Sequence, residues 1–232
     1  MRNRLVTCLL VAGVALLGSA DTARAQQTLN LSLGYFTPRG EDARAQGDVL
    51  NENLTFLTFD LSEFNGASVG AEWLMPFGEY VEGGIGISFS RRTVASVYTD
   101  YIDDDGTEID QDLRLRLVPL AFTIRLTPLG RASVVQPYVG AGLGIVNWRY
   151  SESGEFVDFG AGGMIFRDQF VANGSQVGPV VVGGIRFGSD TVSAGGEVRY
   201  HAAEADLDEG LFAGPRIDLG GWTYNVTVGY RF

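Results

Sequence analysis

The sequence predicts an all-β fold: an up-and-down antiparallel transmembrane β-barrel of eight strands. Three observations support this prediction. Apolar and polar residues alternate with a period of two along most of the chain, the polar set is rich in glycine and includes charges, and short and long connections alternate. After residue 25 there is no run of 18 consecutive apolar residues, so we expect strands rather than helices to cross a membrane.

The composition excludes several other classes of protein. The chain has 232 residues, 45% of them hydrophobic and 11% aromatic, with a formal net charge of -11 and one cysteine. A disordered chain would contain fewer apolar and aromatic residues, and a disulfide-stabilised scaffold would need more cysteines. A pI of about 4.5 argues against a nucleic-acid partner. No motif for a cofactor occurs, and we expect none to be bound.

The first 25 residues are predicted to be a cleaved secretory signal peptide. Arg2 and Arg4 precede an apolar run over residues 5–18, and the small residues after it end in the A-x-A pattern Ala23-Arg24-Ala25. The alternative, a membrane anchor, is disfavoured because the run is shorter than the roughly 20 residues of a spanning helix. The predicted organisation is therefore a signal peptide at 1–25 and a barrel domain at 26–232.

Eight segments show the alternation expected of strands that face lipid on one side. In the last segment, Trp222, Tyr224, Val226, Val228 and Tyr230 share one face with Phe232, and the aromatic residues at its two ends are typical of interfacial girdles. Pro119 is the weakest point, since proline removes a ladder donor. The eight expected strands are residues 29–35, 67–73, 81–89, 118–126, 138–145, 181–187, 192–201 and 221–232.

The connections predict how the barrel is oriented. Residues 76–79, 127–136 and 188–190 are expected to be short periplasmic turns, and residues 37–65, 91–112, 149–175 and 202–220 long outer loops. The long segments hold 22 of the 27 acidic residues after residue 25 but 7 of the 14 basic ones, so the outer loops should be acidic. Residues 54–61 are interpreted as a strand extension or ordered loop, with a ten-stranded barrel as the minor alternative.

Three stretches carry a resemblance to a known family: residues 137–144, residues 195–200, and the terminal Tyr230-Arg231-Phe232. Residues 26–232 resemble the small eight-stranded outer-membrane barrels of the OmpA transmembrane-domain, OmpX and OmpW type. The resemblance implies a location in the cell outer membrane, contact with its lipid and lipopolysaccharide, and a monomer. Tyr230 and Phe232 resemble the C-terminal signal by which the barrel-assembly machinery recognises its clients.

Charged residues at inward positions are the candidate functional groups of the lumen. We expect them to form a salt-bridge network that fills a barrel too narrow for an aqueous channel. The alternative is a gated path for ions or small solutes. Inward glycines such as Gly140, Gly142 and Gly184 either make room for long arginine side chains or leave a cavity. The predicted lumen charge network comprises Glu72, Glu82, Arg125, Arg186, Glu197, Arg199 and Arg231.

Catalysis and metal binding are weakly supported. Lipid A deacylases of the barrel type place a serine two positions from a histidine, whereas His201 is followed by Ala202 and Ala203. Ser193 would be roughly 26 Å away along the same strand. We therefore predict no catalytic residue. An acidic run holds weak calcium candidates, but it does not fit a calcium-binding loop, and no metal is expected. These candidates are Asp103, Asp105 and Asp110.

The predicted function is that of a non-enzymatic outer-membrane protein, a scaffold whose acidic outer loops meet other surfaces. The alternative is a narrow channel for small or apolar solutes, suggested by inward Leu74, Tyr138 and Val182 beside many glycines. A lipid A-modifying hydrolase is the remote alternative. A plugged lumen without conductance would distinguish the scaffold from the channel.

Overall fold

The computed structural model describes residues 27–103, 105–158, 160, 162–188 and 191–232, so the predicted signal peptide at 1–25 lies outside the described residues. Strands dominate, and no helix of the described part is long and apolar enough to cross a membrane. The elements are β1 (Thr28–Pro38), η1 (Glu41–Ala43), α2 (Val49–Asn53), β2 (Leu57–Thr58), η2 (Leu61–Phe64), β3 (Gly66–Pro76), β4 (Val81–Ile102), β5 (Glu108–Leu126), β6 (Val135–Asp158), β7 (Met164–Gly188), β8 (Val192–His201), β9 (Glu204–Asp206), β10 (Arg216–Asp218) and β11 (Gly221–Arg231).

Eight of these strands close into one barrel. The hydrogen-bonded order is β4-β3-β1-β11-β8-β7-β6-β5, and β5 pairs again with β4 to complete the ring. Every neighbouring pair in the ring is antiparallel. The predicted eight-stranded up-and-down barrel is thus confirmed. The ten-stranded alternative is wrong, because within residues 54–61 only the two-residue β2 forms, and it adds to the outer part of β4.

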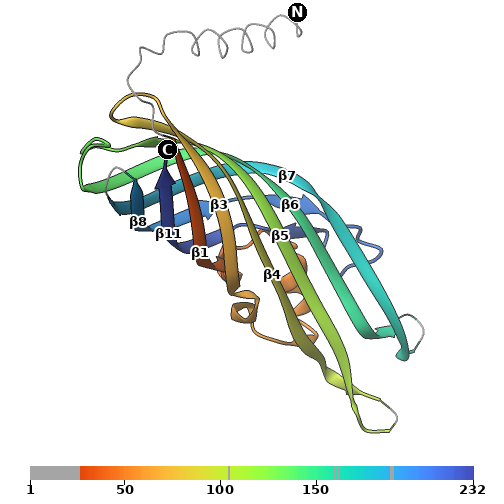
Figure 1. The fold of residues 1–232 in the computed structure, drawn as a ribbon. Coiled ribbons are helices and arrows are strands. Elements are labelled where there is room, and N and C mark those ends of the chain that lie inside the picture. The colour runs from red at the N-terminus through yellow and green to blue at the C-terminus, as the bar shows by residue number, and fades with distance from the viewer. Residues whose placement is uncertain (1–26, 104, 159, 161, 189–190) are drawn as a thin grey trace, which may run out of the picture.

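The strands fall into two groups by length, as Figure 1 shows. β1, β3, β8 and β11 have 10 or 11 residues, whereas β4, β5, β6 and β7 have 19 to 25. The long strands extend beyond the short ones as a curved wall. The prediction that residues 91–112 and 149–175 are loops is therefore wrong for most of their length. The β6–β7 register runs without a shift from Val135↔Phe187 to Asp158↔Met164.

Along the long strands, successive side chains keep pointing inward and outward in turn. Partway along, however, the apolar residues change from the outward face to the inward face. In the membrane part of β5, Ile124 faces outward and is 66% exposed, while Arg125 faces inward and is fully buried. In the extension of the same strand, Leu113 is fully buried inside and Asp112 is exposed outside. Pro119 lies between the two parts and keeps its place opposite Val146 in the sheet register. The exchange occurs because the outer surface of the extension meets water instead of lipid.

Two outer loops fold against the inner side of the long strands (Figure 1). The loop after β1 carries α2, whose first turn is capped by the Asp48 side chain accepting from the Leu50 and Asn51 amides. The loop after β8 pairs β9 with β10. Together with the extensions they bury one apolar cluster, here called the apolar cap, which includes Val49, Leu50, Phe64, Leu113, Leu115, Leu117, Trp148, Tyr150, Phe212, Ile217 and Leu219.

Candidate functional site

The polar lumen below the apolar cap contains a ring of two arginines and two carboxylates. Arg125 on β5 donates through Nη2 to Glu72 of β3 and, at 2.9 Å, to Glu197 of β8. Arg199 donates through Nη2 to the other oxygens of the same carboxylates, at 3.0 Å to Glu72 and 2.8 Å to Glu197. The four groups alternate in charge, so each carboxylate that is removed from water keeps two cationic donors.

A second ion pair lies nearer the end of the barrel that carries the short turns. The Arg186 Nη2 atom donates to both carboxylate oxygens of Glu82, at 2.8 and 3.0 Å. Tyr138 connects it to the ring, because the guanidinium carbons of Arg125 and Arg186 lie 4.8 and 5.2 Å from the centre of its aromatic ring. Its hydroxyl donates to Glu197 at 3.0 Å. The two clusters and Tyr138 are called the lumen network below.

The seventh predicted charge, Arg231, contacts an inward residue outside the predicted set. Arg231 Nη2 donates to the Oε1 atom of Gln136 at 2.8 Å. Gln136 in turn donates to the carbonyls of Arg131 and Ser133 in the turn that precedes β6. Sequence reasoning missed Gln136, although its position two residues before the inward Tyr138 places it on the same face of the strand.

The inward glycines make room for the lumen network. A Cβ atom on Gly184 would lie 2.6 Å from the Tyr138 hydroxyl, and one on Gly140 would lie 2.9 Å from Cγ of Arg125. Positions with large polar side chains therefore lie beside glycines on the neighbouring strands. A cavity of about 20 Å³ lies beside Glu72, Glu197 and Arg199. Such a volume suits a single water.

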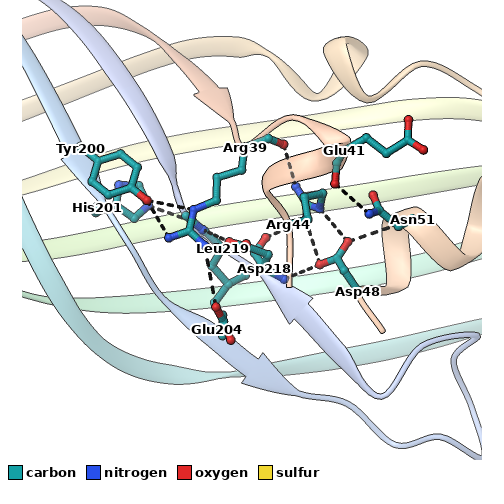
Figure 2. Close-up of polar contacts among 11 residues, drawn as sticks. Arg39, Glu41, Arg44, Asp48, Asn51, Tyr200, His201, Glu204, Asp218 and Leu219 are labelled. Atoms are coloured by element: carbon teal, nitrogen blue, oxygen red, sulfur yellow. Dashed lines mark hydrogen bonds and ion pairs between the residues drawn. The ribbon is translucent and has the colours of Figure 1, made fainter. Parts of the chain in front are cut away.

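Above the lumen network, a polar cluster ties the two outer loops together (Figure 2). The Arg44 and Asp48 side chains are fully buried and form an ion pair at 2.7 Å. Asp48 also accepts from the backbone amide of Asp218, whose carbonyl accepts from Arg44 at 2.8 Å. Arg39 donates to the Asp218 carboxylate at 2.9 Å and to the Tyr200 hydroxyl. We call Arg39, Arg44, Asp48 and Asp218 the loop latch.

His201 takes part in the packing of this same region. Its ring is 4% exposed and stacks on Phe36 with 5.6 Å between ring centres. Its Nε2 atom lies 2.9 Å from the Leu219 carbonyl, and a carbonyl only accepts, so Nε2 carries a proton. Ser193 lies near the opposite end of β8.

A buried carboxyl that sequence reasoning missed lies in the extension. Glu152 accepts from the Tyr150 hydroxyl and from Asn53 of α2, both at 2.7 Å. Burial raises the pKa of Glu152, although these two hydrogen bonds act in the opposite direction. Burial also raises the pKa of the Tyr150 hydroxyl, which therefore remains a donor. The continued alternation after Val146 and Trp148 was the signal that predicts its inward position.

The three acidic metal candidates are not brought together. Asp105 accepts from the amide and hydroxyl of Thr107 in the tip between β4 and β5. Asp110 lies on β5, opposite Val97, with an exposed side chain. Among the described residues, which omit position 104, no group of three potential ligands is placed to hold a metal ion.

The outer surface of the membrane part is apolar around the whole ring. Leu33, Ile124, Val177 and Val226 are each more than 60% exposed although they lie in the middle of paired strands. Aromatic residues flank this belt, among them the stacked pair Tyr230 and Phe232, exposed at 56% and 60%. A water-soluble protein does not expose so large an apolar belt, whereas lipid covers it in a transmembrane barrel.

Comparison with solved structures agrees with this class. The chain is similar to the outer membrane protein OprG from Pseudomonas aeruginosa, with a TM-score of 0.53 and 13% identity over 90% of this chain and 96% of that one. It also aligns, at a TM-score of 0.45 and 11% identity, with Ail of Yersinia pestis (90% of this chain, 99% of that one) and with Neisserial surface protein A (89% and 97%). No family model and no curated protein matches the sequence.

The fold and the apolar belt therefore define a small eight-stranded outer-membrane β-barrel. The predicted resemblance in fold is confirmed, and with it the outer-membrane location, because closed β-barrels with a lipid-facing belt are the architecture of that membrane.

Proposed function

We propose that this protein is a non-enzymatic scaffold of the outer membrane whose closed barrel holds a rigid, acidic surface outside the cell. The observation that carries the proposal is that two layers of side chains, one charged and one apolar, fill the interior of the barrel. Ion pairs occupy the membrane part, and the apolar cap occupies the outer part, with the loop latch holding the two outer loops in place. These two layers occupy the interior that a diffusion pore would keep open as a wide polar passage, which supports a closed scaffold.

The outward surface of the extension and tips supports a role in contact with other surfaces. Asp100, Glu108, Asp110 and Asp112 are exposed on the β4–β5 hairpin. Strand pairing resumes at Ile102↔Glu108 after a register shift between Val97 and Ile102, so Glu108, Asp110 and Asp112 stand on a paired strand. An ordered display loses less conformational entropy when a partner binds than a mobile loop does.

Single-channel recording tests the proposal. The barrel is refolded in lipid, its folding is verified by heat-modifiable gel mobility, and it is inserted in planar bilayers beside a known porin as positive control. We expect a folded barrel without conductance steps. Steady conductance of the folded protein would contradict the closed scaffold and support the narrow channel.

The absence of enzymatic activity belongs to the same proposal. His201 donates to a backbone carbonyl and packs on an aromatic ring, which suits a structural histidine. Incubation with lipid A should release no fatty acid. Release that disappears in His201→Ala would instead identify the protein as a hydrolase.

A further inference from the structure

Three arginines stand in one row on the outer surface of the long strands. Arg91 of β4 lies directly opposite Arg116 of β5, and Arg116 lies directly opposite Arg149 of β6. All three side chains are exposed. Arg114 lies two residues before Arg116 on β5, donates to the Thr93 hydroxyl and is next to these three arginines on the outer surface. We call Arg91, Arg116 and Arg149 the arginine row.

The row is electrostatically costly without a counter-ion. Residues directly opposite in a sheet have Cβ atoms about 5 Å apart, and like charges in such pairs destabilise it. Ion pairs elsewhere in residues 27–103, 105–158, 160, 162–188 and 191–232 involve other arginines and none of these three. This clustering occurs in a chain with a net charge of -11. An anion bound across the row would remove the repulsion.

The row lies at the outer boundary of the apolar belt. Arg91 comes two residues after Phe89, which is exposed to lipid, and Arg149 follows the outward Leu143 by six. With a rise of about 3.3 Å per residue, Arg91 stands roughly 7 Å along the strand from Phe89. In a bilayer, the polar headgroup region begins where the hydrocarbon core that covers such a belt ends. A shallow depression of about 150 Å³ is formed there by Arg91, Arg114, Arg116, Arg149, Ser151 and Gln169.

We propose that the arginine row binds the phosphate groups of an outer-leaflet glycolipid, the lipid A part of lipopolysaccharide. Guanidinium groups bind phosphate oxygens in pairs of hydrogen bonds, and the exposed Gln169, which also lines the depression, offers a further polar group. The acyl chains of such a lipid would lie on the apolar belt directly below. The inference rests on the orientation in the proposed function, with the long strands outside.

The test is a titration of the detergent-solubilised, folded barrel with bisphosphorylated lipid A, with bound lipid counted by native mass spectrometry. A basic residue at a lipid surface changes affinity by about fivefold, so Arg116→Gln should weaken binding about fivefold and the triple variant Arg91→Gln, Arg116→Gln, Arg149→Gln about a hundredfold. Lipid A stripped of its phosphates should bind the wild type as weakly as phosphorylated lipid A binds the triple variant.

The control is a second triple variant with the same change in net charge, Arg92→Gln, Arg167→Gln, Arg216→Gln, whose side chains are exposed outside the row. It should bind lipid A as the wild type does. Equal weakening in both triple variants would overturn the proposal in favour of diffuse attraction, and unchanged binding in the row variant would overturn it outright.

Competition with soluble tripolyphosphate distinguishes binding of a lipid from binding of a free anion. We expect it to compete weakly, because it lacks acyl chains for the belt; full competition at equal concentration would overturn the assignment to a lipid. Since the row faces away from the lumen, its variants should leave conductance unchanged. Failure of lipid binding and failure of the closed scaffold are therefore distinguishable.

Discussion

The membrane and outer parts of β4, β5 and β6 place opposite chemistry on the same faces. In the membrane part, apolar side chains point outward and the lumen holds ion pairs; in the extension, apolar side chains point inward and the outer face is polar. The direction of alternation does not change along β5, since Leu113 and Arg125 share the inward face. The surrounding medium, lipid or water, therefore decides which face of one continuous strand is apolar.

The largest effect is expected from removing charge inside the membrane part. Arg125→Leu would leave Glu72 and Glu197 with Arg199 as their shared partner, and one uncompensated buried charge costs about 3–5 kcal/mol. Urea unfolding of the barrel in lipid vesicles would measure the loss. Arg125→Lys, which keeps the charge, should lose less. A change below about 1 kcal/mol would show that the lumen is well hydrated.

The converse change removes an apolar group inside the extension. Leu113→Ala should cost about 2–5 kcal/mol, because the side chain is fully buried in the apolar cap. The expected readout is faster proteolysis of the loop at residues 202–220 while the heat-modifiable mobility of the barrel persists. Asp112→Ala, one residue away on the outer face, should stay within about 0.5 kcal/mol of the wild type. Equal effects of the two would contradict the inward packing of the extension.

A third pair of variants compares the two outer faces. Val226→Arg, at a lipid-facing position that is 68% exposed, should cost about 2–4 kcal/mol near the membrane midplane. Ala95→Arg, exposed on the extension opposite Asp112, should be nearly neutral because water surrounds it. Unfolding free energies in vesicles would measure both. A neutral Val226→Arg would place that face outside lipid.

The smallest effect concerns pH and the apolar cap. Because the folded pKa of Glu152 is raised, its contribution to cap stability is fully present below the unfolded pKa of about 4.3 and is lost as the pH rises through the folded value. Proteolysis of the outer loops should therefore be slower near pH 4 than near pH 8. Glu152→Gln should reduce this pH dependence, and an unchanged profile would assign it to other groups.

Local patterns were sufficient for much of the barrel. Alternation at Trp222 to Phe232 predicted the last strand, and the same rule identified the inward positions of Glu72, Arg125 and Glu197, because a strand's period of two depends only on backbone geometry. The ends of β4 to β7 were predicted wrongly. Residues 91–112 and 149–175 were interpreted as charged outer loops, whereas most of their charged side chains lie on the water-exposed face of extended strands.

The barrel class, the strand directions and the charges that point into the lumen could be predicted from the residues alone, because they follow from composition and from contacts between near neighbours in the chain. Which charges meet, how Tyr138 joins Arg125 to Arg186, and that Asp48 contacts Asp218, 170 residues away, depend on the three-dimensional fold. The arginine row likewise exists only across three strands. Register between strands sets these contacts, and it is decided by the closure of the whole ring.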